Sequence, residues 1–381
     1  MRVVLDGQVT GADGIARATR HLAAALMRLA PEAGLSLTVI PPSGTPRYSQ
    51  AEGDHLLAAA RRHHADVLHL LDYRIPLAPA PLPLVATVHD LLRLIRPQHC
   101  YTDQQFARRF GPDRLDLLAE ATRALRTLTP PPPGALRFPA SWHEEFYGLM
   151  TAYTAATATA VITPTRTVAD HLAEAVGYRV PTVIAPWGVD HLPASAHGAG
   201  PLPKELRPGG YLLYVGQARS HKGLPCLLAA YAATRAAQRG MRLALAGRDF
   251  TTGFADSADL PPGTTLLGEV DDTQLAHLYM HAAALVHLAE HEGFGFPPLE
   301  ALSFGTRVLV ADLPVLRETL GRHAYFTDPA ASPAATARTL DHLLDEPDSD
   351  QQRRSRAAWA ARYRWDTCAR HVIDCYRKAL T

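Results

Sequence analysis

Two glutamates separated by a glycine turn are the strongest sign of chemistry in this chain. Glu292 and Glu300 stand eight positions apart in the sequence. The turn after the first of them consists of Gly293, Phe294, Gly295 and Phe296. Glycines let a ligand come close to the backbone. The apolar run before the turn and the alanine-rich pattern after it predict a strand, a turn and a helix start. Such a place suits an anion and a polyol, because N–H groups at a helix N-terminus bind anions.

Each acid has a plausible role in such a site. Glu300 falls in the first or second turn of the expected helix, since Pro297 or Pro298 suits the first helical position. A carboxylate there can accept two hydrogen bonds from a vicinal diol such as a ribose. Glu292 stands in the turn itself and can bind a sugar hydroxyl. Acids near helix starts also complement the helix dipole, so Glu300 taken alone is open to both interpretations.

A second segment carries positive charge. In Tyr211–Gly223 an apolar strand ends at Gly216, and the loop after it holds Arg219, His221 and Lys222 before a helix begins. Cations at a helix start suit a diphosphate, because its negative charge grows as it becomes a leaving group. For Lys222 alone, an ordinary surface lysine is the alternative interpretation.

Composition limits the class of protein. The chain has 381 residues, enough for two domains, and 47% of them are hydrophobic. Lys plus Arg total 38 and Asp plus Glu total 37, a balance that argues against nucleic acid as the main partner. No apolar run is long enough to span a membrane, and the N-terminus lacks the apolar core of a signal peptide. The four cysteines have no metal-type spacing, which favours a cytoplasmic protein.

Short apolar runs alternate with helical patterns along the whole chain. Strands are expected at Val3–Asp6, Leu35–Ile40, Asp66–Leu71, Leu84–His89, Ala160–Thr163, Tyr211–Gly216, Arg242–Gly247, Thr265–Leu267, Ala284–Ala289 and Arg307–Ala311. Helices are expected at Gly14–Leu29, Thr165–Val176, Leu224–Gln238, Asp272–Ala283, Pro298–Phe304 and Ala334–Leu344. This alternation predicts an α/β protein with two Rossmann-like domains built on parallel sheets.

The domain borders follow from composition. Pro193–Gly210 is rich in Pro, Gly and Ala and reads as a linker. We expect an N-terminal domain over 1–195, a linker over 196–210, a second domain over 211–362 and a C-terminal helical segment over 363–381. Ligands of parallel α/β sheets bind beyond the carboxyl ends of the strands, so two facing domains would hold their active cleft between them.

The acidic turn resembles the E-x7-E signature of the retaining glycosyltransferases of family four, which have the two-domain GT-B fold. The resemblance covers nearly the whole chain in the family's order. Lys222 matches the lysine of the family's G-x-x-x-x-x-K-[GN] motif, which begins here at Gly216. His89 and Asp90 are similar to the family's H-D pair on the acceptor side, and Gly14 stands in a segment similar to its N-terminal G-I-x-R loop.

Some positions depart from that pattern or stay ambiguous. Gln217 stands where the family has Arg or Asn, and Arg219 lies two positions further on. The resemblance implies that backbone near Val270 faces the nucleotide base. His89 can equally be a core residue whose ring nitrogens are hydrogen-bonded within the protein, and Asp90 can be a helix cap.

The resemblance implies a retaining hexosyltransferase of the polysaccharide biosynthesis type. Lys222 and Arg219 would neutralise the donor diphosphate, Glu300 would hold the ribose, and His89 would lie near the acceptor. Glu292 and the N–H groups around Phe294–Phe296 would orient the sugar. The acceptor would be a hydroxyl of a glycan, a lipid-linked sugar or a small molecule. No metal or other cofactor is expected, and the C-terminal helix would pack on the first domain.

Other interpretations stay open. The same fold supports nucleotide-sugar epimerases and phosphorylases, and a non-catalytic subunit could bind the nucleotide sugar without turnover. Within Leu92–Phe146, arginines lie among apolar residues, at Arg108, Arg109, Arg114, Arg123 and Arg126. They form either a solvated helix face or a face that contacts an anionic acceptor or an anionic lipid surface, which would be the inner face of the membrane.

Overall fold

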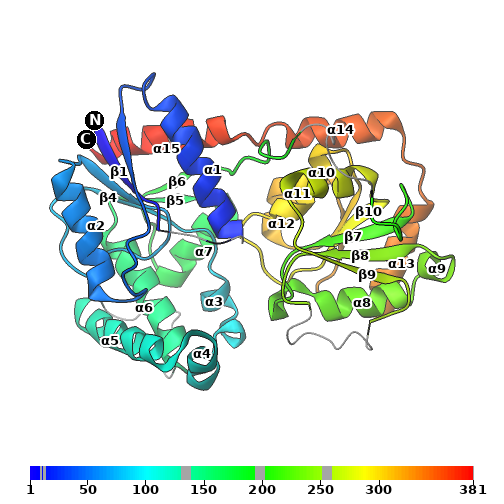
Figure 1. Cartoon of the computed structure of the whole chain (residues 1–381), viewed down its shortest axis with the longest axis horizontal. Coiled ribbons are helices and arrows are strands. Elements are labelled where there is room, and N and C mark those ends of the chain that lie inside the picture. The colour runs from blue at the N-terminus through cyan, green and yellow to red at the C-terminus, as the bar shows by residue number, and fades with distance from the viewer. Residues whose placement is uncertain (9–10, 12–13, 130–138, 194–201, 251–259, 381) are drawn as a thin grey trace. The chain divides into compact units, whose positions relative to one another are not determined.

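The computed structural model (Figure 1) describes the chain apart from residues 9–10, 12–13, 130–138, 194–201, 251–259 and 381. Part of the predicted linker and part of the N-terminal glycine loop therefore lie outside the described residues. The contacts divide the chain into two compact units. Unit 1 holds Met1–Gly188 and the C-terminal segment from Trp365, and unit 2 holds Val189–Arg364.

Unit 1 is built on one parallel sheet of six strands in the order β2-β1-β3-β4-β5-β6. Its strands are β1 (Arg2–Asp6), β2 (Ser36–Ile40), β3 (Val67–Leu70), β4 (Leu84–Thr87), β5 (Ala160–Thr163) and β6 (Thr182–Ile184). Every residue of β3, β4 and β5 is buried, as expected for parallel strands covered on both faces. The short β6 is the one strand of this sheet that the apolar pattern does not predict.

The helices of unit 1 cover this sheet. They are α1 (Gly14–Leu29), α2 (Gln50–Arg62), α3 (Leu92–Ile95), η1 (Pro97–His99), α4 (Asp103–Phe110), α5 (Pro112–Leu128), α6 (Trp142–Thr157), α7 (Arg166–Val176) and α15 (Trp365–Ala379). Figure 1 shows the C-terminal helix α15 lying beside α1, and the two are in contact. Cys368 and Cys375 are buried on the inner side of α15, so they serve core packing.

Unit 2 repeats the architecture with the strand order β12-β11-β10-β7-β8-β9, again all parallel. Its strands are β7 (Tyr211–Val215), β8 (Arg242–Ala246), β9 (Thr264–Gly268), β10 (Ala284–His287), β11 (Val308–Ala311) and β12 (Tyr325–Thr327). Its helices are η2 (Ser220–Lys222), α8 (Leu224–Ala232), α9 (Arg235–Gln238), α10 (Asp272–His281), α11 (Phe296–Ser303), α12 (Pro314–Leu320), η4 (Gly321–His323), α13 (Pro333–Asp345) and α14 (Asp350–Ala360). The two sheets confirm the predicted fold class.

One predicted helix of unit 2 is wrong in detail. The expected helix over Leu224–Gln238 is broken into α8 and α9 at Thr234. The Thr234 hydroxyl donates to the carbonyl oxygen of Tyr231 and accepts from the N–H of Ala237, so it caps the second helix. The next helix, α10, is capped by Asp271, because its carboxylate accepts from the N–H of Gln274.

A buried histidine of unit 1 predicts a pH dependence of stability. In β3, Nδ1 of His69 lies 2.6 Å from the hydroxyl of Tyr376, and Nε2 lies 2.9 Å from the Thr87 hydroxyl. Burial lowers the pKa of His69 from its ordinary 6.5 to about 3, so the folded protein keeps the ring neutral. Between pH 6.5 and pH 3, the unfolded chain therefore binds a proton on this ring that the folded protein does not bind. Stability is therefore full above pH 6.5 and falls as the pH drops toward 3.

The substitution His69→Gln keeps a polar side chain and removes this titration. Between pH 7 and pH 5, we expect wild type to lose about 2 kcal/mol of unfolding free energy relative to the variant. Amide hydrogen exchange in β3, corrected for the intrinsic rate at each pH, measures the change locally. A difference between the two proteins that is constant across this pH range would contradict the assignment.

Two glycines with similar backbone angles in unit 2 allow a controlled test of its loop packing. Gly223 (φ 65°) ends the loop after η2, and a Cβ atom there would lie 2.0 Å from the carbonyl oxygen of Leu288. Gly240 (φ 86°) has no heavy atom within 4 Å of the same position. We expect Gly240→Ala to cost only the left-handed strain of about 1–2 kcal/mol. Gly223→Ala must also displace the loop from the segment that follows β10. We therefore expect its melting temperature to fall further than that of Gly240→Ala. Equal decreases in melting temperature for the two variants would refute this packing.

Candidate active site

The predicted strand, glycine turn and helix are confirmed around the two acids. The turn follows β10, and α11 begins at Phe296 with Gly295 in the left-handed conformation at its N-cap. The helix thus starts one residue before the expected proline, with Pro297 in its first turn and Glu300 in its second. The left-handed N-cap needs glycine, because an L side chain is strained there (φ 87°) and a Cβ would meet Leu316 at 2.6 Å.

Glu292 is held by two basic side chains. Its Oε1 atom lies 2.6 Å from Nζ of Lys222 and 2.7 Å from Nε2 of His287. Burial raises the pKa of Glu292, but the charge of Lys222 and the hydrogen bond from His287 outweigh it and hold this pKa well below its usual range. Glu292 is therefore an anion at neutral pH, paired with the lysine that the sequence analysis places in the same site.

Glu300 lies deeper than a surface acid. Only 1% of its side chain is exposed, and both carboxylate oxygens have protein partners. The hydroxyl of Tyr279 in α10 donates to Oε2 at 2.8 Å, and Nε2 of His191 lies 3.1 Å from Oε1. The helix-dipole interpretation alone does not explain this burial, since a charge taken from water needs hydrogen-bonding partners.

The loop after β7 brings the expected cations to the same edge of the sheet. Nε of Arg219 donates to the side-chain oxygen of Gln217 at 3.1 Å, and its Nη2 lies 3.7 Å from Oδ2 of Asp249. Gln217 thus orients Arg219. The backbone N–H of Glu290 donates to the carbonyl oxygen of His221 at 2.8 Å, which joins the cationic loop to the acidic turn.

Parallel strands explain why these distant segments meet. The loop that starts at Gly216 follows β7, Gly247 follows β8, Val270 follows β9, and Glu292 follows β10. The carboxyl ends of parallel strands share one edge. The loops there are in close contact, because a Cβ on Gly247 would lie 1.9 Å from the carbonyl oxygen of Gly216. Unit 2 therefore gathers Gly216, Arg219, Lys222, Val270, Glu292, Gly293, Phe294, Gly295, Phe296 and Glu300 at this edge.

The remaining candidate residues lie in unit 1. Nε2 of His89, after β4, lies 2.9 Å from the carbonyl oxygen of Leu71, and its ring packs 5.5 Å from that of Trp187. Asp90 accepts from the N–H of Leu92 at 3.0 Å, which agrees with a helix-start role. Gly14 is the exposed first residue of α1.

Several residues at these edges were missed by the sequence analysis. In unit 2 they are His191, Tyr279 and His287, which contact the two acids. In unit 1, Arg74 donates from Nε to Oδ2 of Asp72 at 3.0 Å and from Nη1 to Glu52 at 3.2 Å. The charges of Arg74 and Arg47 outweigh burial and lower the pKa of Asp72. None of these residues belongs to a short motif, and only the histidine inside the apolar run of β10 gave a local signal.

The arginine face of α5 is engaged within unit 1. Arg126 forms a bidentate pair with Glu145 at 2.6 and 2.7 Å, and the guanidinium groups of Arg123 and Arg126 lie over the ring of Trp142. These contacts agree with a solvated helix face. Within the described ranges, no helix combines the length and hydrophobicity of a bilayer span. No cluster of three or more His, Cys, Asp or Glu side chains suited to a metal occurs among the same residues.

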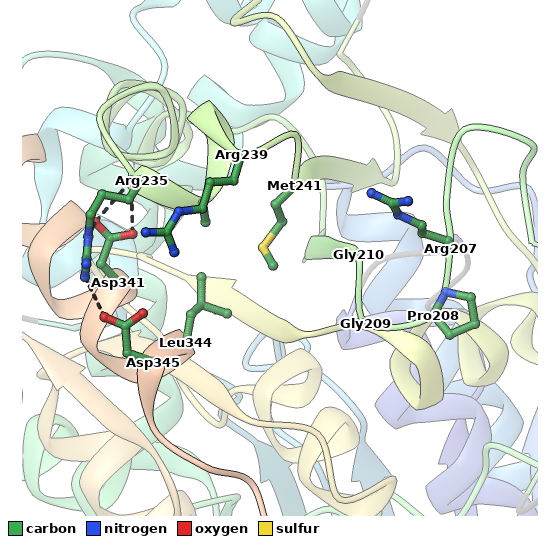
Figure 2. Close-up of a pocket in the computed structure, with 11 residues that line it drawn as sticks. Arg207, Pro208, Gly209, Gly210, Arg235, Arg239, Met241, Asp341, Leu344 and Asp345 are labelled. Atoms are coloured by element: carbon green, nitrogen blue, oxygen red, sulfur yellow. Dashed lines mark hydrogen bonds and ion pairs between the residues drawn. The ribbon is translucent and has the colours of Figure 1, made fainter.

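A separate cavity of about 370 Å³ opens at the amino edge of the sheet in unit 2 (Figure 2). Its lining includes Gly209 and Gly210, which precede β7, and Met241, which precedes β8. Arg235 is paired there with Asp341 at 3.3 Å and Asp345 at 2.6 Å. This cavity lies at the opposite strand ends from the acids and contains none of the predicted site residues, so it is not the candidate active site.

Comparison with known proteins agrees with the geometry. The family model described as Glycosyl transferases group 1 matches residues 205–361. The chain is 30% identical over 175 residues to O-antigen chain mannosyltransferase B of Escherichia coli, covering 44% of this chain and 46% of that protein. It is also 30% identical over 182 residues to the GDP-mannose:cellobiosyl-diphosphopolyprenol alpha-mannosyltransferase of Xanthomonas campestris, covering 45% and 48% of the two proteins. The matched stretch is about half the length of each of these curated relatives.

Solved structures show the same fold over the whole chain. Sucrose-phosphate synthase from Thermosynechococcus elongatus superposes with a TM-score of 0.68 at 17% identity, over 99% of this chain and 98% of that one. The two six-stranded parallel units are thus those of the GT-B fold. The family match falls on unit 2, where the acids and the lysine meet, so this part of the chain is similar to the glycosyl transferases group 1 family.

Proposed function

We propose that this chain is a retaining hexosyltransferase that takes mannose from GDP-mannose and transfers it to a hydroxyl of a lipid-linked glycan. The observation that carries the proposal is the pair of Lys222 and Glu292, 2.6 Å apart at the carboxyl edge of unit 2. It supplies a cation for a diphosphate beside an anion for a sugar hydroxyl. The choice of donor and acceptor is supported by the name of the Xanthomonas relative.

The diphosphate is bound by positive charge in this proposal. An ammonium group has three donors, so Lys222 can turn from Glu292 to bind the phosphate oxygens of the diphosphate. Arg219 is the second cation, held in place by Gln217. These two side chains neutralise the charge that develops on the leaving diphosphate, so the reaction needs no metal ion.

The sugar and the ribose are bound by the two acids. Glu292 and the N–H groups around Phe294–Phe296 orient the sugar at the start of α11. Glu300 accepts from the ribose diol. A carboxylate has about four acceptor positions, so the existing bonds from Tyr279 and His191 leave room for a further donor.

The transfer proceeds on one face of the sugar. The acceptor hydroxyl oxygen forms a bond to the anomeric carbon as the bond to the phosphate oxygen breaks, and the leaving phosphate takes the hydroxyl proton. The products are the glycoside and GDP. In His89, Nε2 donates to Leu71, which leaves Nδ1 as the acceptor that can orient a hydroxyl.

We place the reaction in the cytoplasm. All four cysteines are free thiols, Cys100, Cys226, Cys368 and Cys375, as suits a reducing compartment. A lipid-linked acceptor would bring the protein to the inner face of the membrane through its substrate.

Binding of the free nucleotides tests the identity of the base. A ligand at about 100 times its Kd stabilises the folded protein by about 2.7 kcal/mol. We expect GDP to raise the melting temperature more than UDP or dTDP at equal concentration. A larger shift with UDP would replace GDP-mannose by a UDP-sugar as donor. No shift with any of the three would contradict nucleotide binding itself.

The role of Lys222 is tested by measuring the rate of sugar transfer. We expect Lys222→Ala to lower the rate of transfer from GDP-mannose by a factor that corresponds to about 2–4 kcal/mol of barrier. Lys204→Ala, at an exposed lysine of the same unit, is the matched control and keeps the wild-type rate. The readouts are GDP release and glycoside formation with and without a lipid-linked glycan.

The rival functions give different results in the same assay. Conversion of the sugar without any acceptor would indicate an epimerase, and dependence on inorganic phosphate would indicate a phosphorylase. GDP binding without turnover over a broad acceptor panel would indicate a non-catalytic subunit. Equal rates for wild type and Lys222→Ala would remove Lys222 from the mechanism.

A further inference from the structure

We propose that His287 is a positioning residue that holds Glu292 in place while Lys222 engages the donor diphosphate, an inference that rests on the proposed transferase function. His287 is absent from the motifs that identify the site. It acts through Glu292, at 2.7 Å, and has no need to contact the substrate itself.

The position of His287 is unusual for a polar side chain. It is the last residue of β10, which lies between β11 and β7 in the middle of the sheet, and its register partner on β11 is Val310. Only 1% of its side chain is exposed. A polar ring in such a place costs free energy unless its nitrogen atoms are hydrogen-bonded. The short contact with Glu292 meets that need at Nε2.

The chemistry of the partners assigns the direction of this bond. Glu292 is ionised, so it only accepts, and the hydrogen must lie on Nε2 of His287. Nδ1 is buried and has no hydrogen-bond partner among the described residues. Nε2 is therefore the ring nitrogen through which His287 is held in this environment. His287 is thus a fixed donor aimed at one carboxylate oxygen.

Lys222 and His287 converge on the same oxygen of Glu292. Both lie within 2.7 Å of Oε1, and no described residue is bonded to Oε2. This leaves Oε2 as the oxygen available to a sugar hydroxyl. The lysine is 22% exposed at the end of η2, whereas the histidine is fixed in the sheet. When a diphosphate competes for the lysine, the histidine alone keeps the carboxylate oriented.

Glu300 offers a comparison within the same turn. It also contacts a buried histidine, His191 at 3.1 Å, but Tyr279 holds its second oxygen. Glu300 is therefore fixed at both oxygens by groups that a diphosphate does not attract. Glu292 has a single such group, so its geometry in the loaded enzyme depends on His287.

The test compares two substitutions of His287. Leucine has a similar volume and no donor, while glutamine can place an amide N–H near the position of Nε2. GDP release from GDP-mannose and glycoside formation are measured at saturating acceptor, together with the melting temperature of each variant. His342→Gln is the matched control. His342 likewise contacts a glutamate, with its Nε2 atom 3.1 Å from Oε1 of Glu346, but it is exposed on α13.

We expect His287→Leu to lower kcat by about 10- to 100-fold, as for the loss of a hydrogen bond to a charged group. KM for GDP-mannose changes much less, because the diphosphate contacts remain. His287→Gln restores most of kcat, and His342→Gln matches wild type. A purely structural role would lower the melting temperature without this split and without rescue by glutamine.

Two outcomes overturn the inference in distinguishable ways. If wild type transfers mannose and His287→Leu keeps its kcat at an unchanged melting temperature, the positioning role is wrong and the proposed function stands. The same conclusion follows if glutamine and leucine reduce kcat equally. If wild type shows no turnover of GDP-mannose or of any other nucleotide sugar, the proposed function fails and the role of His287 fails with it.

Discussion

The candidate site depends on keeping a carboxylate ionised where little water reaches it. Burial alone would favour the neutral form of Glu292, and a neutral acid could not pair with Lys222. The ammonium of Lys222 and the ring N–H of His287 reverse that preference, and the pKa of Glu292 stays below its usual range. The arrangement is stable only with its partners present, because a buried charge left alone costs several kcal/mol. The lysine and the acid are therefore best regarded as one unit.

The parallel sheet brings these partners together although they lie far apart in the sequence. Lys222 and Glu292 are separated by seventy residues, yet both follow adjacent strands, β7 and β10. Because parallel strands end at one edge, side chains from their exit loops meet without any special long-range contact. Glycines then bring the loops together. Gly223 lies against the carbonyl of Leu288, and Gly247 against that of Gly216, at distances where a Cβ atom would clash. The fold thus places charged residues that are distant in the sequence in one cluster.

The same physics explains which features the sequence predicts. Periodic apolar runs and glycine turns are local signals, so the central strands and the turn at Glu292 were predicted correctly. Thr234 is also local, but its capping role competes with the apolar pattern and was missed. His191 and Tyr279 contact Glu300 across long sequence separations. No local pattern encodes such a contact, because it depends on the register of whole strands and helices. The network of Arg74, Asp72 and Glu52 in unit 1 was missed for the same reason.

The two acids of the turn differ in a way that bears on their roles. Glu300 is nearly inaccessible and bonded at both oxygens, so it is already organised before any ligand arrives, and a contact that it makes would be the same in the ground state and the transition state. Such a contact contributes to affinity more than to rate. Glu292 is 12% exposed, and Lys222, which is 22% exposed, contacts only its Oε1 atom. In the proposed mechanism, the interaction of Glu292 strengthens as charge moves onto the diphosphate and Lys222 shifts toward it. On that proposal, the eight-residue spacing separates a binding acid from an acid whose contribution depends on the progress of the reaction.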